Sequence, residues 1–186
     1  MPTLSSAVFP PSDLWDYAVI LYSQDEVMRA ALAVQDRAGA DVNMLLFCIW
    51  AAARGRRLTA EEMEAAFSAS LRWQTEVVRP LRTARRYLKS PDLATDLRLA
   101  GELRRGVADS ELFAEHMQLL MLERSVAPPS PATTDPETVA ATALAHLESY
   151  FRAAGIAITP EDEADLQIIC HAAFPDAAAA GGSYSR

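Results

Sequence analysis

The stretch QDRAGADVNMLLFCIW, residues 35–50, decides the fold, because one helix ends in it, the chain turns, and the most apolar helix begins. Gly39 can adopt the left-handed conformation that closes a helix, and Asp41 can cap the N–H groups of the next one. Residues 42–53 contain one clearly polar side chain, that of Asn43. We therefore predict a central buried helix at residues 42–53, with the other helices packed around it.

The composition of the whole chain favours an all-α fold. Of the 186 residues, 51% are hydrophobic and only seven are Gly, while Ala and Leu dominate. Good helix formers are abundant and β-branched residues are sparse, so no credible strand is predicted. We expect a helical bundle of about five core helices in a domain at residues 1–124, a Pro-rich linker at 125–136, a C-terminal helical hairpin at 137–174 and a disordered tail at 175–186.

Capping and breaking residues predict where the helices start and stop. Pro80 has no N–H to donate, so we expect it to kink or split the helix in which it lies. The helical region at 91–124 contains two glycines, which favour a break at 105–110. The expected N-caps are Ser12 or Asp13, Ser23, Ser90, and Thr59 with Glu62 as a capping box.

The cysteines and the N-terminal sequence indicate a cytoplasmic protein. Cys48 and Cys170 are far apart and both lie beside apolar residues, as reduced core thiols do. The N-terminus lacks a basic segment followed by an apolar run, so no signal peptide is predicted. No run of 18 apolar residues occurs, which argues against membrane insertion.

Four segments carry a family resemblance. They are LY at 21–22, LAVQDRAGADVNMLLFCIW at 32–50, Trp73, and VVRPLRTARRYLK at 77–89. Together they resemble an uncharacterised proteobacterial family, domain of unknown function 2390, over roughly residues 13–120. The resemblance implies a bacterial protein, but it brings no catalytic residues that could be assigned to positions of this chain.

A basic segment stands out in an otherwise acidic chain. The formal net charge is −8, yet residues 54–89 hold nine Lys or Arg against four Glu. Helical spacing places most of these cations on one stripe, opposite an apolar face. The stripe can be a solvated face, an ion-pairing surface within the protein or with a partner, or a phosphate site. Its candidate residues are Arg72, Arg79, Arg82, Arg85, Arg86 and Lys89.

Polar residues gather at the turn around Gly39. They are Gln35, Asp36, Asp41 and Asn43. One interpretation is structural: a buried network in which Asp36 or Asp41 pairs with Arg85 or Arg86 and fixes how the helices cross. The other makes the same groups the polar end of a small pocket lined by Tyr22, Trp50 and Trp73.

Metal and catalytic signatures are weak. The three histidines are isolated from one another, and no zinc-type or Cys-x-x-Cys motif occurs. Glu111, Glu115 and His116 share one helical face, but a di-metal bundle needs a second copy of such a motif. No Gly-rich phosphate loop or nucleophile motif is found. We therefore predict no metal and no cofactor, and the sequence does not support an enzyme.

Three hypotheses for function remain open. The first is a non-enzymatic helical interaction module that uses the basic stripe to contact an acidic protein partner or a second copy of itself. The second is binding of a small anionic or amphipathic ligand, or an enzyme acting on one, between the central and the kinked helix, with Arg85 and Arg86 as anion contacts and Trp50 and Trp73 as walls. The third is nucleic-acid binding, against which the acidic net charge argues.

Overall fold

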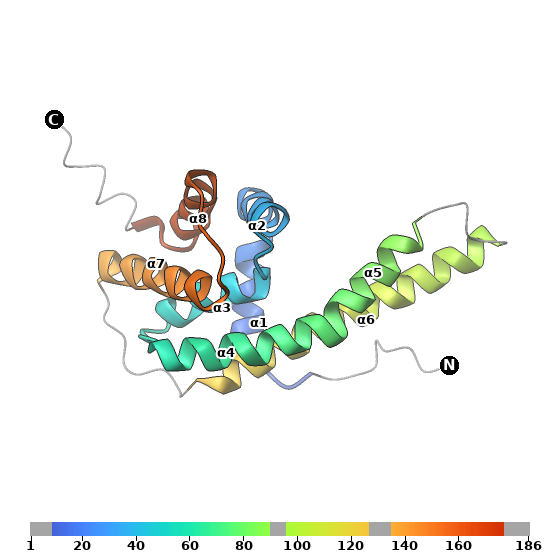
Figure 1. Cartoon of the computed structure of the whole chain (residues 1–186), viewed down its shortest axis with the longest axis horizontal. Coiled ribbons are helices and arrows are strands. Elements are labelled where there is room, and N and C mark those ends of the chain that lie inside the picture. Colours follow the sequence, from blue (N-terminus) through green and yellow to red (C-terminus); the bar gives the residue numbers. More distant parts are fainter. Residues whose placement is uncertain (1–8, 90–95, 127–134, 177–186) are drawn as a thin grey trace.

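A computed structural model describes residues 9–89, 96–126 and 135–176. Within these ranges the chain is helical, as predicted, and forms no strand (Figure 1). The elements are α1 (Asp13–Tyr22), α2 (Asp25–Ala38), α3 (Val42–Ala53), α4 (Ala60–Trp73), the π-helical turn η2 (Gln74–Val78), α5 (Arg79–Tyr87), α6 (Leu97–Ser125), α7 (Pro136–Ala153) and α8 (Pro160–Ala173).

Helix α3 is the centre of the molecule, as the sequence predicts. Every residue from Asn43 to Ala52 is buried, and α1, α2, α6 and α7 all pack against this helix. The turn before it has the predicted geometry: Gly39 has a φ of 72°, and the Asp41 side chain accepts a hydrogen bond from the Asn43 N–H at 3.0 Å. A helix contacted on several sides has no solvated face, which explains its apolar sequence.

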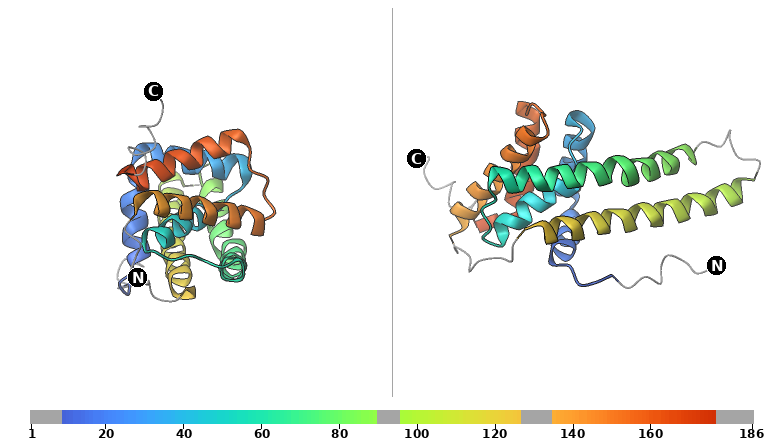
Figure 2. Two further views of the ribbon diagram at one scale, coloured as in Figure 1. Left: turned by 90° about the vertical axis from the view of Figure 1, so that its left-hand side faces the viewer. Right: turned by 60° about the horizontal axis from the view of Figure 1, so that its bottom comes forward.

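Helices α4, η2 and α5 follow one another almost in line, and α6 returns beside them as an antiparallel partner. The outer part of this pair, α5 with the first half of α6, projects from the rest of the molecule as an arm (Figures 1 and 2). Pro80 lies in the first turn of α5, directly after the π-helical turn. The expected kink or split at Pro80 is therefore not present; the helix continues, and the irregularity is a widened turn in which the Arg79 N–H donates to the Gln74 carbonyl.

The predicted break in the next helix is wrong. Helix α6 runs without interruption from Leu97 to Ser125, through both of its glycines. Glycine lowers helix stability by only about 1 kcal/mol relative to Ala, and packing of α6 against α5 across this segment outweighs that cost. The N-cap of α6 is Asp96, whereas the expected cap Ser90 lies outside the described residues.

The other caps were predicted with mixed success. Ser12 accepts from the Trp15 N–H, and Thr59 forms the expected capping box with Glu62. The expected cap at Ser23 is wrong, because α2 begins after Gln24 without a side-chain cap. The Ser23 hydroxyl donates instead to the Ile20 carbonyl, in the last turn of α1.

The two C-terminal helices pack on the rest of the protein rather than chiefly on each other. Helix α7 lies against α3 and α4, and α8 lies against α2 (Figure 1). Tyr150 and Phe151 of α7 are buried in the same hydrophobic core as α3. Arg37 of α2 forms ion pairs with Asp162 and Asp165 of α8 at 2.7 and 2.6 Å. Most of the predicted linker and most of the predicted tail lie outside the described residues.

Cys48 and Cys170 are both buried and free, as expected of core thiols. Burial raises the pKa of each thiol, so neither is poised to react as a thiolate. Within the described ranges, no helix combines the length and the apolar character needed to span a bilayer.

Candidate functional site

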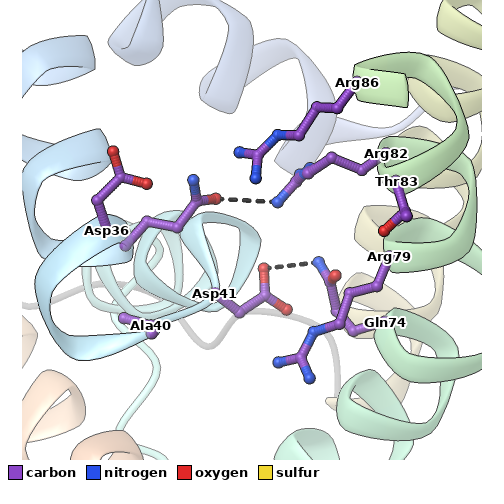
Figure 3. A pocket seen from close by; sticks show the side chains of 10 residues that line it. Asp36, Ala40, Asp41, Gln74, Arg79, Arg82, Thr83 and Arg86 are labelled. Carbon is purple, nitrogen blue, oxygen red and sulfur yellow. Dashed lines mark hydrogen bonds between the residues drawn. The ribbon is translucent and has the colours of Figure 1, made fainter. Parts of the chain in front are cut away.

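A cavity of about 370 Å³ opens between the α2–α3 turn and the start of α5. The turn supplies one wall, and η2 with α5 supplies the other, so the site depends on the two irregular points of the backbone, Gly39 and the π-helical turn (Figure 3). The residues that line this first cavity are Gln35, Asp36, Gly39, Ala40, Asp41, Gln74, Arg79, Arg82, Thr83 and Arg86.

Three arginines project from α5 toward this cavity. Arg79, Arg82 and Arg86 are spaced by three and four residues, which places them on one face of the helix. Figure 3 shows their side chains extending from α5 toward the turn. Arg79 and Arg86 are exposed, and among the described residues neither has a hydrogen-bond or ion-pair partner. Two guanidinium groups are therefore available to an anion here.

The opposite side of the cavity is a buried carboxylate network around Asp41. Its Oδ1 accepts from the Asn43 N–H and from Gln74 Nε2, both at 3.0 Å. Its Oδ2 accepts from the Ser70 hydroxyl at 3.1 Å and from Gln118 Nε2 at 2.6 Å. Every hydrogen bond to the Asp41 side chain thus comes from a neutral donor, and the donors lie on α3, α4, η2 and α6.

Burial raises the pKa of the Asp41 carboxyl group, and the hydrogen bonds from Gln118, the Asn43 N–H and Ser70 oppose that shift. The π-helical turn contributes directly, because its first residue, Gln74, is buried and donates into the network. Tyr150 of α7 closes the far side, since its hydroxyl accepts from the Asp41 N–H at 2.8 Å. The network fixes the α2–α3 turn against the base of α5.

A second cavity of about 360 Å³ adjoins the first and shares Gln35, Arg82 and Arg86 with it. The rest of its lining is mainly apolar and comes from α1, α2, α3 and α6, with Arg85 from α5. Trp15 is held in this wall by stacking on His116, with ring centroids 3.9 Å apart. The further lining residues are Trp15, Ala18, Val19, Tyr22, Leu32, Val42, Asn43, Leu46, Arg85, Glu111, Leu112, Glu115 and Leu119.

An ion-pair cluster joins α5 to α6 beside the second cavity. Arg82 donates to Glu111 at 3.0 Å, to Glu115 at 2.7 Å and to Gln35 at 3.1 Å. Arg85 also pairs with Glu111, through both its Nε and its Nη2. Although burial opposes it, hydrogen bonding to these arginines lowers the pKa of Glu111. For Glu115 burial is the larger influence and raises the pKa, despite Arg82.

The structure brings only part of the predicted basic stripe to the cavities. Arg79, Arg82 and Arg86 line the first cavity, and Arg85 lies at the second. Arg72 and Lys89 are exposed and line neither. Two of the four arginines that line a cavity, Arg82 and Arg85, form ion pairs with glutamates. Fewer cationic side chains are therefore available to a ligand than the sequence indicates.

The two tryptophans do not form pocket walls. Trp50 is buried and its indole donates to Asp13 at 2.7 Å, whereas the Trp73 indole donates to the Ala114 carbonyl at 2.9 Å. Neither lines either cavity, and Trp15 takes the role expected of them. Tyr22, the third expected wall residue, does line the second cavity.

The expected polar network is present with different partners. Asp41 is bonded to neutral groups and not to Arg85 or Arg86, and Asp36 is exposed at the rim of the first cavity. Gln35 bonds to Arg82, and Asn43 Nδ2 donates to Gln118 at 2.8 Å. Neutral donors satisfy a buried carboxylate at a lower desolvation cost than a second buried ion.

Sequence reasoning missed three members of the network: Ser70, Gln74 and Gln118. Ser70 and Gln74 continue the buried face of α4, and Gln118 interrupts the apolar run of α6. Polar side chains at otherwise core positions were the available signal, because a buried polar group needs a hydrogen-bond partner.

The whole lining of both cavities falls within the segment 13–122. A family model described as "Protein of unknown function (DUF2390)" matches this same segment. The chain belongs to the DUF2390 family. This confirms the resemblance noted in the sequence. The part of the chain shared with the DUF2390 family model supplies the whole lining of both cavities, while α7, with Tyr150, and α8 lie beyond the match. No curated protein and no solved structure matches the chain significantly.

Proposed function

We propose that this DUF2390 protein binds a small organic anion, with the carboxylate or phosphate group held between Arg79 and Arg86 in the first cavity. The observation that supports the proposal is a contrast within one helix. Arg82 and Arg85 are paired with glutamates of α6, but Arg79 and Arg86 face the cavity without an ion-pair partner among the described residues. Guanidinium groups bind carboxylate and phosphate through directed, charge-assisted hydrogen bonds.

The surroundings suit such a role. The Asp41 network holds the α2–α3 turn in place, and the Arg82 cluster holds α5 against α6, so contacts within the protein fix the two elements that form the walls. A preorganised site loses less conformational entropy on binding. Its volume of about 370 Å³ lies near the lower end of the range typical of small-molecule sites.

An NMR titration of the full-length protein at low ionic strength tests the proposal. Inorganic phosphate and butyrate serve as the probes, and backbone amide shifts are followed throughout the chain. We expect saturable changes centred on residues 35–41 and 79–86. The variant Arg79→Gln/Arg86→Gln should lose these changes, and Arg72→Gln should keep them. The absence of any saturable change for either probe would contradict the proposal.

A second candidate function, docking of an acidic protein partner, is favoured by the surface of the arm. Tyr87, Leu97, Leu99 and Leu103 are all more than half exposed there, at 61%, 66%, 52% and 58%. Arg98, Arg104 and Arg105 are exposed on the same part of α6. Apolar anchors surrounded by cations suit a partner that offers acidic and apolar side chains.

This second candidate has its own test. The full-length protein and the variant Leu99→Asp/Leu103→Asp are compared in affinity purification from the native host, with nuclease added. Docking through the arm predicts a partner that the wild type retains and the variant loses. A partner that both forms retain equally would rule out the arm as its docking surface.

A further inference from the structure

The second cavity is lined mainly by apolar side chains, and an anion bound in the first cavity does not occupy it. It lies directly beside the arginines, yet most of its lining is hydrocarbon or aromatic, including Trp15, Leu46 and Leu119. Val19, Leu32 and Leu112 at this cavity are 49%, 38% and 54% exposed. Apolar side chains that line a cavity and also remain open to water favour an apolar ligand group.

The two cavities adjoin at three shared side chains. Gln35, Arg82 and Arg86 belong to the lining of both, and the hydrogen bond from Arg82 to Gln35, at 3.1 Å, joins two of these three shared side chains. Arg82 is fixed by Glu111 and Glu115, whereas Arg86 has no ion-pair partner among the described residues. Because Arg86 lines both cavities, an anionic head group bound at Arg86 lies at the edge of the second cavity, next to its apolar lining.

We infer that the ligand is an amphipathic anion, with a carboxylate or phosphate head between Arg79 and Arg86 and one flexible apolar chain in the second cavity. This inference rests on the proposed function and adds the class of molecule. The second cavity, at about 360 Å³, has room for one chain of medium length. Carboxylate and phosphate heads share the same recognition by guanidinium groups.

A chain-length series tests the inference on the full-length protein. Butyrate, octanoate and dodecanoate are compared by titration below their critical micelle concentrations, and octyl phosphate is included to separate the two head groups. Each methylene group buried in the second cavity is expected to tighten binding about two- to fourfold. The affinity should stop rising once the chain fills the cavity.

Two double variants locate the chain. Leu32→Gln/Leu112→Gln changes two partly exposed residues of the second cavity, so the fold is expected to survive. The matched control, Leu97→Gln/Leu103→Gln, changes two exposed leucines of the arm that line neither cavity. We expect the first variant to bind butyrate as the wild type does but to bind dodecanoate at least tenfold more weakly. The control should behave as the wild type.

The outcomes separate this inference from the proposed function. If phosphate and butyrate bind through Arg79 and Arg86 but affinity does not rise with chain length, the inference is wrong and the proposed function stands. If dodecanoate binds equally well to Arg79→Gln/Arg86→Gln, the head-group assignment is wrong and both proposals are overturned. If the control variant loses dodecanoate as fully as the cavity variant, the chain does not occupy the second cavity.

Discussion

Two pairs of arginines on helix α5 have the same side chain and opposite surroundings. Arg82 and Arg85 pair with Glu111 of α6, which has only 7% of its side chain exposed, although Arg82 also lines the first cavity. Arg79 and Arg86 face the first cavity, where the described residues offer them no ion-pair partner. The difference separates two roles within one basic stripe: one pair holds the arm together, and the other is available to a ligand.

The largest effect on stability is expected for Arg82→Met. It removes one cation from three partners and leaves Glu111 and Glu115 with less compensation. Because Arg82 retains 22% exposure, we expect a loss of about 3 kcal/mol in the free energy of unfolding, at the low end for a broken buried pair. Urea denaturation measures the loss. The control Arg72→Met, at an exposed position of the same stripe, should change stability by less than about 0.5 kcal/mol.

A loss of about 2 kcal/mol is expected for Asp41→Asn, on the other side of the first cavity. The carboxylate accepts hydrogen bonds at both oxygens, so an amide nitrogen at either position would face N–H or O–H donors. Thermal unfolding at pH 7 measures the change. Unchanged stability would show that the network tolerates a donor and does not hold the α2–α3 turn as we describe.

A pH-dependent effect is expected for Glu111→Gln. The pKa of Glu111 is lowered in the folded protein, so its contribution to stability is fully present above the ordinary value of 4.5 and is lost as the pH falls through the folded-state value. At pH 7 the variant should be less stable by roughly 1–2 kcal/mol. Between pH 5 and about 3 the wild type should lose stability more steeply than the variant. Parallel stability curves would contradict the assigned ion pairs.

Glu115 provides an internal contrast for that experiment. Its pKa is raised in the fold, so its ionisation disfavours the folded state as the pH rises above 4.5. Glu111→Gln and Glu115→Gln should therefore change the pH profile in opposite directions. Glu64→Gln, at an exposed position of α4, serves as the control.

The smallest effect concerns the rim of the first cavity. Asp36 is exposed there and places a negative charge near the proposed anion site. Removing this charge in Asp36→Asn should tighten phosphate binding about twofold and leave stability unchanged, since exposed charges interact weakly in water. Weaker binding in this variant would indicate that Asp36 contributes a contact to the ligand.

Local features of the fold could be predicted from sequence, because each depends on residues close together in the chain. Gly39 with Asp41, and Thr59 with Glu62, are examples. The error at α6 has a tertiary cause: glycines that would weaken an isolated helix are tolerated when the helix packs along a partner, as α6 does along α5. The error at Ser23 has a local cause instead, because its hydroxyl bonds to the Ile20 carbonyl, three residues back in α1, and does not cap α2.

The candidate site could be predicted only in part. The periodicity of α5 identifies its arginines, but Glu111 lies 26 residues from Arg85 and 29 from Arg82, so no local pattern shows which arginines are paired. The π-helical turn also shifts the facing of every later residue in this helix, and it has no reliable sequence signature beyond the nearby Pro80. Trp15 lines the second cavity, where Trp50 and Trp73 were the expected wall residues. It lies on α1, and the sequence does not specify how α1 packs against the other helices.

The most direct test of whether Arg79 and Arg86 form a ligand site compares ligand binding by two variants that have the same net charge. Arg79→Gln/Arg86→Gln and Arg72→Gln/Lys89→Gln each remove two positive charges from exposed positions of the same segment. Octanoate is titrated into both variants and the wild type by calorimetry, with unfolding curves as a check on the fold. We predict that both variants are as stable as the wild type and that only the first loses octanoate binding. Equal binding, or equal loss, in the two variants would contradict the division of roles within the stripe.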